Sequence, residues 1–314
     1  MSRVHDALRR AESQGLPVEP VPAAFTTPER PPRANGHGYG NGNRNGNGHS
    51  NGHGNGNGHG RGSAHAKASS QKNPFRPEML EDVQVVPFQP AIESHLLDLD
   101  NNPETPAEEF RTLRTRLNHL ATLQPLHTII VTSPSPAEGK TFTAVNLALA
   151  ESQLSENLVL LGDFDLRRPI VHNLFQIDRA PGLSDFLTGE CSFTQALRKV
   201  EGTNLYLLPA GSAVKNPLEL LNMRQAKRLF EELPNCFNWA IFDTPPLLFS
   251  ADANLLATLA DGTILVVKIG STTFDSVTRA MQSLCENNVL GIVANGARAS
   301  ELYSKYTYYY SKAD

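Results

Sequence analysis

Short apolar runs alternate with amphipathic segments over the C-terminal part of the chain. The apolar runs are LHTIIVTS, LVLLGDFD, LYLLPAG, WAIFDTPP, TILVVKIG and VLGIVANG, and helical patterns such as TFTAVNLALAES separate them. Runs so rich in aliphatic and β-branched residues are typical of parallel strands buried on both faces. The pattern therefore predicts an α/β fold, a doubly wound parallel sheet flanked by helices.

The segment TPAEEFRTLRTRLNHLATL precedes the first of these runs and predicts a helix. Thr105 and Glu108 have the spacing of a capping box, and Pro106 stands at the first helical position. Glu108, Arg111 and Arg114 follow one another at i+3 steps on the polar side, a spacing that alone indicates an exposed intrahelical ion pair. The apolar side consists of Phe110, Leu113, Leu117 and Leu120.

The N-terminal part of the chain has a different composition. Residues 1–16 carry Val4, Ala7, Leu8 and Ala11 at helical spacing, which predicts either an amphipathic docking helix or a frayed end. Residues 17–75 are rich in Pro, Gly, Asn and His, and they predict a disordered linker because they cannot bury enough apolar area to offset their ordering entropy. The folded domain is expected at 76–297, followed by a flexible tail at 298–314.

Composition excludes several functions. The net charge of −4 gives no basic field for nucleic acid or an anionic membrane, so neither is an expected partner. The three cysteines have no metal-ligand spacing, which suits a reducing compartment. No apolar run reaches the roughly 18 residues that a membrane-spanning helix needs. We therefore expect a cytoplasmic chain without a membrane span.

The segment TSPSPAEGKTFTAVNLA follows an apolar run and opens a helical pattern, as a phosphate-binding loop does. In such a loop the backbone N–H groups face the phosphates, Lys140 reaches the β- and γ-phosphates, and the Thr141 hydroxyl holds Mg²⁺. Pro134 and Ala137 stand where glycine is usual. ATP and Mg²⁺ are the predicted cofactors, and the nucleotide-binding residues are Ser135, Pro136, Ala137, Glu138, Gly139, Lys140, Thr141 and Phe142.

Acidic residues end two further apolar runs. Asp163, Asp165 and Arg167 lie in LVLLGDFDLRRP, and Asp243 lies in WAIFDTPPLL. Ligands of open parallel sheets bind beyond the carboxyl ends of the strands, so these side chains are expected to converge on the phosphate loop. The alternative is that they cap helices or close turns.

The chain ends YSKYTYYYSKAD and places five of its seven tyrosines in one eight-residue window. Interleaved Ser, Lys and Thr residues favour an accessible tail. The alternatives are an aromatic strand or interface patch and an end without consequence. The tyrosines concerned are Tyr303, Tyr306, Tyr308, Tyr309 and Tyr310.

In order and spacing, SPSPAEGKT, LLGDFDLRRP and IFDTPP resemble the Walker A, Walker A′ and Walker B motifs of bacterial tyrosine kinases, the autokinases of capsular and exopolysaccharide synthesis. The resemblance covers about residues 100 to 314. It includes NPLELL and also EEFRTLRTRL, which is similar to that family's oligomerisation motif at Glu108, Arg111 and Arg114. It implies a P-loop NTPase-like fold and an ATP-dependent protein-tyrosine kinase.

The same resemblance assigns roles to the candidate residues. Lys140 and the loop amides would stabilise charge on the transferred phosphoryl group, and Asp163 is the candidate base for the tyrosine hydroxyl. Arg167 is counted with the catalytic residues. The tyrosine tail would be the substrate, phosphorylated in trans within a ring whose subunits pair through Glu108, Arg111 and Arg114. Mg²⁺ would be held by Thr141, Asp163, Asp165 and Asp243.

The implied partners are a separate membrane co-polymerase-type activator, which would recruit the chain to the inner face of the membrane, and a protein-tyrosine phosphatase. Two other functions stay open. A MinD/ParA-type ATPase shares the three motifs but carries a lysine early in the loop, where this chain has Ser135. A nucleotide-gated, non-catalytic regulator of the polysaccharide machinery would fit the unusual Ala137 and Gly162.

Overall fold

The computed structural model describes residues 75–89, 96, 107–284 and 289–297, all within the unit Lys67–Asp314. These residues form an eight-stranded sheet with the order β1-β4-β5-β3-β6-β2-β7-β8. The predicted docking helix, the tail and all of the linker except Phe75 lie outside the described residues. The strands are β1 (Gln84–Val86), β2 (Thr128–Thr132), β3 (Val159–Asp163), β4 (Arg198–Val200), β5 (Leu205–Leu208), β6 (Trp239–Asp243), β7 (Gly262–Lys268) and β8 (Val289–Asn295).

The six predicted apolar runs form six neighbouring strands of the sheet, in the order β5, β3, β6, β2, β7 and β8. All pairings among these six strands are parallel. The predicted fold class is confirmed. The sheet departs from the prediction at one edge, where β4 runs antiparallel to β5 and β1 is added beside β4. Only four residues join β4 to β5, which is too short for a parallel crossover, and Gly202 turns the chain with φ +71°.

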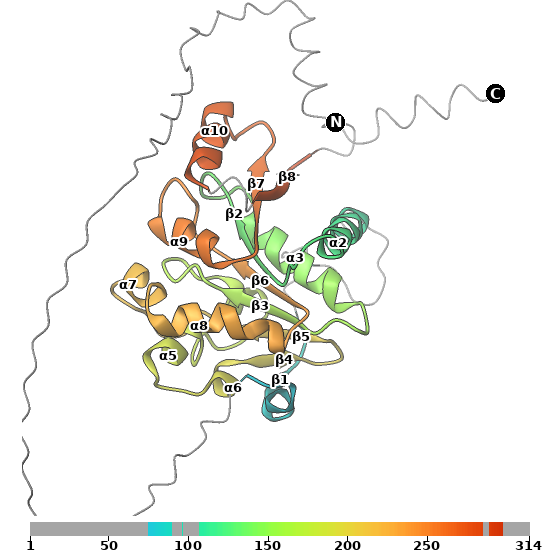
Figure 1. Cartoon of the computed structure of the whole chain (residues 1–314), viewed down its shortest axis with the longest axis vertical. Coiled ribbons are helices and arrows are strands. Elements are labelled where there is room, and N and C mark those ends of the chain that lie inside the picture. Colours follow the sequence, from blue (N-terminus) through green and yellow to red (C-terminus); the bar gives the residue numbers. More distant parts are fainter. Residues whose placement is uncertain (1–74, 90–95, 97–106, 285–288, 298–314) are drawn as a thin grey trace, which may run out of the picture. The chain divides into compact units, whose positions relative to one another are not determined.

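Helices cover both faces of the sheet (Figure 1). Alternate strand residues point to opposite faces, so Ile129 and Val131 pack toward α2 and α3 while Ile130 packs on the other side. One face carries α2 (Ala107–Ala121), α3 (Lys140–Ser152) and α4 (Val171–Leu174). The other carries α5 (Leu183–Thr188), α6 (Phe193–Ala196), α7 (Pro217–Leu221), α8 (Arg224–Glu232), α9 (Ala251–Leu259) and α10 (Phe274–Ser283), with 3₁₀ turns η1 (Pro77–Asp82) and η3 (Leu233–Asn235).

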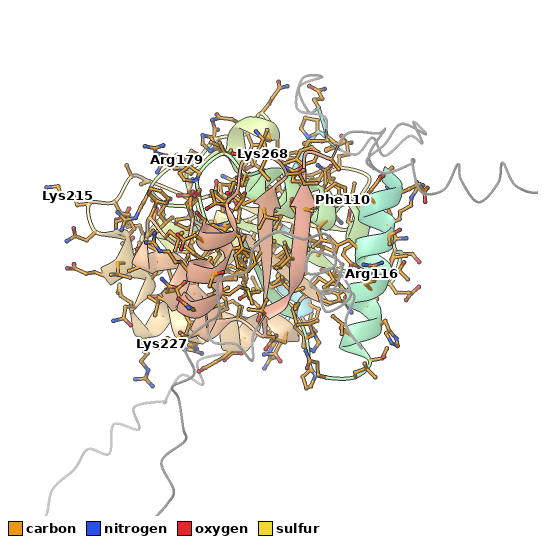
Figure 2. All side chains as sticks on the ribbon, turned by 90° about the horizontal axis from the view of Figure 1, so that it is seen from above. Phe110, Arg116, Arg179, Lys215, Lys227 and Lys268 are labelled. Carbon is orange, nitrogen blue, oxygen red and sulfur yellow. The ribbon has the colours of Figure 1, made fainter. Side chains whose placement is uncertain are left out.

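Helix α2 has the predicted amphipathic face. Phe110 and Leu117 are buried, and Leu113 and Leu120 are half-buried against the same core. The Phe110 ring, labelled on α2 in Figure 2, lies 5.9 Å from the Phe142 ring at the start of α3. The predicted cap, Thr105 and Pro106, lies outside the described residues. None of the described helices is long and apolar enough to cross a bilayer.

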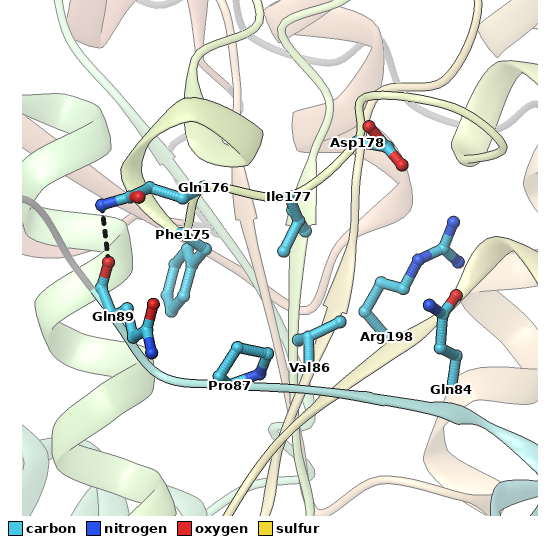
Figure 3. Close-up of a pocket in the computed structure, with 9 residues that line it drawn as sticks. All are labelled: Gln84, Val86, Pro87, Gln89, Phe175, Gln176, Ile177, Asp178 and Arg198. Carbon is cyan, nitrogen blue, oxygen red and sulfur yellow. Dashed lines mark hydrogen bonds between the residues drawn. The ribbon is translucent and has the colours of Figure 1, made fainter.

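The segment that leads into β1 is anchored at the sheet edge. Phe75, the last residue of the predicted linker, is buried beside Phe186 and Phe193. A cavity of about 250 Å³ lies between the strand end and the turn after α4, where the Gln176 amide donates to the Gln89 carbonyl at 2.8 Å (Figure 3). This cavity shares no lining residue with the cleft at the phosphate loop.

Candidate functional site

Sheet register brings two predicted carboxylates together. Asp163 is the last residue of β3 and Asp243 the last of β6, and the two are direct partners in the parallel ladder. Both are fully buried. The backbone N–H of Phe164 donates to the carbonyl of Asp243 at 2.8 Å, which ties the two strand ends. The structure therefore places the ends of the Walker A′-like and Walker B-like strands side by side.

The phosphate loop connects β2 to the first residue of α3, Lys140. Gly139 precedes the helix with φ +96°, a left-handed conformation that favours glycine, and a Cβ there would lie 1.9 Å from Nδ2 of Asn295. Ala137 also has a left-handed backbone, with φ +63°. A glycine would adopt this conformation without strain, whereas the alanine adopts it at some steric cost.

Lys140 lies at the centre of the site. Its Nζ donates to Oδ2 of Asp165 at 2.9 Å and lies 3.3 Å from Oδ1 of Asp243. The Thr141 hydroxyl donates to Oδ2 of Asp243 at 2.6 Å. Four predicted site residues, Lys140, Thr141, Asp165 and Asp243, therefore share a single hydrogen-bonded cluster.

The cluster holds more negative than positive charge. Burial raises the pKa of Asp243 to about 6, although the charge of Lys140 acts in the opposite direction. Burial, reinforced by the charge of Asp243, also raises the pKa of Asp163 well above its ordinary value. Burial opposes protonation of Lys140, but Asp243 and Asp165 outweigh it and the Lys140 pKa is raised. A divalent cation would relieve this excess of buried negative charge.

The oxygen atoms of Thr141, Asp165 and Asp243 suit Mg²⁺, which prefers hard oxygen ligands. Within the described residues, no three His, Cys, Asp or Glu side chains are gathered as a ready metal site. Magnesium at nucleotide sites uses one or two carboxylates and completes its shell with phosphate and water oxygens, so the residues present fit such an ion.

Glu138 stabilises the phosphate loop through three hydrogen bonds. It is 3% exposed, its carboxylate accepts the Ser135 N–H at 2.8 Å and the Thr272 hydroxyl, and its carbonyl accepts Nδ2 of Asn295 at 3.0 Å. Sequence reasoning missed Thr272 and Asn295, since only the fold brings the β7–α10 connection and the end of β8 to the loop. The predicted nucleotide-binding residues that line the cleft are Pro136, Ala137, Gly139, Lys140, Thr141 and Phe142.

The cleft above the loop has a volume of about 710 Å³. Lys140, Thr141 and Asp165 line it, whereas Asp163 and Asp243 are not among its lining residues. Both oxygens of Asp163 accept backbone N–H groups, those of Asp165, Ile170 and Val171. Asp163 therefore lies beneath the cleft, and Asp165 reaches it.

Arg167 is paired with a residue that the sequence did not single out. Its Nε donates to Oδ2 of Asp252 at 2.7 Å and its Nη2 donates to Oδ1 at 3.1 Å. Asp252 is fully buried in the first turn of α9, where Ser250 caps its N–H. The Arg167 side chain, still half-exposed at the cleft, thus joins the segment after β3 to the segment after β6.

Gly162, the unusual residue before Asp163, has a packing reason. A Cβ at this position would lie 2.8 Å from ring carbons of both Phe164 and Phe242. These two rings, 4.5 Å apart, fill the space beside the strand. The glycine therefore allows close ring packing next to the site.

The predicted interface residues lie on α2, and they are not equivalent. Arg111 pairs with Glu108 on the helix surface, whereas Nη1 of Arg114 donates to the Ala150 carbonyl of α3 at 2.7 Å. Arg114 therefore has an intramolecular contact in addition to its predicted intersubunit role. The five predicted phosphorylation sites lie outside the described residues.

Comparisons with known proteins identify the family of the chain. No family model matches the chain. Over 208 residues the chain is 36% identical to tyrosine-protein kinase YwqD of Bacillus subtilis, an alignment that covers 66% of this chain and 87% of that protein. It is also 32% identical over 239 residues to tyrosine-protein kinase etk of Escherichia coli K12, covering 74% of this chain and 32% of the longer relative.

Solved structures lead to the same family. The chimerical protein CapA2B2 superposes with a TM-score of 0.60 at 26% identity, covering 70% of this chain and 97% of that one. The kinase domain of Escherichia coli ETK gives a TM-score of 0.58 at 29% identity, covering 70% and 94%. The resemblance noted in the sequence is thereby confirmed, and the chain belongs to the bacterial tyrosine-protein kinase family.

Proposed function

We propose that the chain is an ATP-dependent protein-tyrosine autokinase that phosphorylates its C-terminal tyrosines in trans and so regulates the synthesis and export of an exopolysaccharide or capsule. The observation that carries this proposal is the buried Lys140–Asp165–Asp243–Thr141 cluster at the start of α3. It supports phosphoryl transfer because such transfer depends on positioning and charge neutralisation more than on covalent chemistry.

Each residue has a distinct task in this mechanism. The loop N–H groups and the N-terminus of α3 would bind the phosphates of ATP, and Lys140 would turn from the carboxylates to the β- and γ-phosphates. Thr141 and Asp165 would hold Mg²⁺ together with the buried Asp163 and Asp243, directly or through water, and the ion would supply charge neutralisation. Releasing Lys140 from Asp165 and Asp243 frees the oxygens that this ion needs.

A tyrosine hydroxyl with a pKa of about 10 needs a proton acceptor at neutral pH. Asp163 has the raised pKa that suits a base, but it lies under the cleft. Asp165 lines the cleft. We propose that one of these two carboxylates is the base. Asp163→Asn and Asp165→Asn would be compared by the pH dependence of the rate at saturating ATP: the base variant would lose the acidic limb of the profile.

The proposed partners follow from the family. Subunits would form a ring through Glu108, Arg111 and Arg114, and several phosphates on one tail would loosen it by mutual repulsion. A membrane co-polymerase-type protein would activate the chain and recruit it to the inner face of the membrane, and a protein-tyrosine phosphatase would reset it. The similar solved structure of the chimerical protein CapA2B2 supports this proposal of a partner.

The test is the intact mass of the full chain before and after incubation with Mg-ATP, beside Lys140→Met. Phosphate increments that map to residues 303–310 and are absent from the variant would support the autokinase. Steady release of free phosphate without increments would favour the ATPase of MinD/ParA type, and neither product would favour a nucleotide-gated regulator. Unchanged Mg-ATP affinity in Lys140→Met would overturn the phosphate-loop assignment itself.

A further inference from the structure

The cleft has an apolar wall that phosphate and metal binding do not use. Ile170 is 43% exposed and Phe249 is 67% exposed, and both line the cleft together with Pro246. Single exposed apolar residues need no explanation, but two large ones that line one catalytic cleft with a proline form a surface for an apolar ligand. Ile170, Pro246 and Phe249 together form the acceptor wall of the cleft.

The loop that carries Phe249 is fixed in place. The N–H of Leu247 donates to the Ser133 carbonyl at 2.8 Å, and the N–H of Leu248 donates to the Pro134 carbonyl at 3.3 Å. Leu247 is itself buried. Phe249 therefore lines the cleft from a segment that is hydrogen-bonded to the start of the phosphate loop.

The sheet order decides which end of a nucleotide meets this wall. Strands β3 and β6 lie on one side of β2, the strand that leads into the phosphate loop, and β7 and β8 lie on the other. Asp165 follows β3 and Asp243 ends β6, so a phosphate group next to the Mg²⁺ that these carboxylates would hold lies on that side of the loop. The adenine base of the nucleotide would then lie on the side away from the carboxylates. Ile170 and Phe249 come from the same two segments as the carboxylates and would therefore adjoin the γ-phosphate.

An in-line transfer brings the acceptor oxygen to the far side of the γ-phosphate from the leaving oxygen. The group that carries that oxygen must stand beside the acceptor wall. The chain offers an aromatic acceptor of this kind, with five of its seven tyrosines at 303–310. Tyr206, by contrast, is buried in β5 beside Phe237 and is not available as an acceptor.

We propose that the acceptor wall, and Phe249 above all, binds the ring of the tyrosine that is phosphorylated, supplied by residues 303–310 of a second copy of the chain. This proposal rests on the proposed function and assigns its acceptor subsite. An aromatic pair formed at the wall selects tyrosine over serine or threonine, because serine and threonine have no ring to pack against Phe249. Phe249 and Ile170 are specificity-determining residues and take no part in proton transfer.

The experiment separates donor from acceptor. The donor is the full chain with its five tail tyrosines changed to alanine, and the acceptor is the full chain carrying Lys140→Met. Phosphate transfer is followed against acceptor concentration, and Mg-ATP affinity is measured separately. Phe249→Ala in the donor is expected to raise the KM for the acceptor about tenfold, with little change in kcat or in Mg-ATP affinity. The acceptor KM of Phe249→Leu is expected to lie between those of the parental donor and Phe249→Ala.

Phe274→Ala is the matched control, because Phe274 is 81% exposed and does not line the cleft. An unchanged acceptor KM in Phe249→Ala would overturn the proposal while leaving the autokinase intact. Weaker Mg-ATP binding with an unchanged acceptor KM would show that the wall holds the nucleotide base, which also overturns it. A parental donor that transfers no phosphate would refute the proposed function, and with it the acceptor subsite.

Discussion

Arg167 and Asp252 form a two-pronged ion pair that joins the segments after β3 and β6 at the rim of the cleft. The carboxylate is fully buried, whereas the side chain of Arg167 is half-exposed. The same two segments carry Ile170 and Phe249 of the acceptor wall. Arg167 therefore stabilises the site through Asp252, independently of any contact with the phosphates.

Arg167→Ala is expected to lower the free energy of unfolding by about 1–3 kcal/mol, because it leaves the buried carboxylate of Asp252 without its charged donor. Urea denaturation measures the change. Arg228→Ala, which removes an exposed pair with Glu232, is the control and should cost no more than about 0.5 kcal/mol. Equal losses in the two variants would contradict the bracing role.

Gly162→Ala is expected to destabilise the fold by about 1–3 kcal/mol, since its methyl group would overlap the rings of Phe164 and Phe242. Gly291→Ala is the matched control: Gly291 also lies in a strand, but a Cβ there meets nothing within 4 Å. Both are compared by urea denaturation. If the two variants have the same stability, the ring-packing explanation of Gly162 is wrong.

The free energy of unfolding is expected to depend on pH because of Glu151. It is fully buried near the end of α3, and burial raises its pKa from 4.5 to about 7 even though Asn118 and Asn157 donate to it. Between these values the folded chain keeps a proton that the unfolded chain releases, so a rise in pH through this window lowers the free energy of unfolding. Asp163 and Asp243, whose pKa values are also raised, act with the same sign.

Glu151→Gln removes this titration. Its stability relative to the natural chain is expected to improve by about 3 kcal/mol between pH 4.5 and pH 8. The measurement is urea denaturation at several pH values, with Glu231→Gln on the exposed side of α8 as the control. A stability difference that does not change with pH would rule out the buried, raised-pKa state of Glu151.

Lys140→Met is expected to steepen the loss of stability with rising pH. The charge of Lys140 lowers the pKa of Asp243, so its removal raises that pKa further and leaves the ionised carboxylates facing one another. The drop in thermal midpoint should therefore be larger at pH 8 than at pH 5. Lys227→Met, at an exposed position on α8 (Figure 2), should show no such difference. Equal drops at both pH values would contradict the charge cluster.

Arg111 and Arg114 of α2 are expected to affect stability differently when they are mutated. Arg114→Ala should lower the free energy of unfolding by about 1 kcal/mol because the Ala150 carbonyl loses its donor. Glu108→Ala combined with Arg111→Ala removes only an exposed pair and should leave stability within about 0.5 kcal/mol. If the interface proposal holds, that double variant still reduces the oligomer mass measured by sedimentation. An unchanged mass would leave α2 without an interface role.

Much of the architecture follows from local pattern. The six apolar runs identify the parallel strands because such strands are buried on both faces, and the phosphate loop is identified by its place between strand and helix. The sequence did not predict strands β1 and β4, because each has only three residues, too few to show an alternation of apolar and polar positions. Their pairing depends on the edge of β5 and on the four-residue turn between β4 and β5.

The sequence by itself determined the parallel α/β fold, the phosphate loop and the strand-end carboxylates, because each depends on neighbours in the chain. Tertiary structure alone decided that Asp165 reaches the cleft while Asp163 lies beneath it, that Arg167 is bound to Asp252, and that Thr272 and Asn295 support Glu138. These contacts join residues far apart in the sequence. Their geometry is set by strand order and register, which are properties of the whole sheet and leave no local pattern to read.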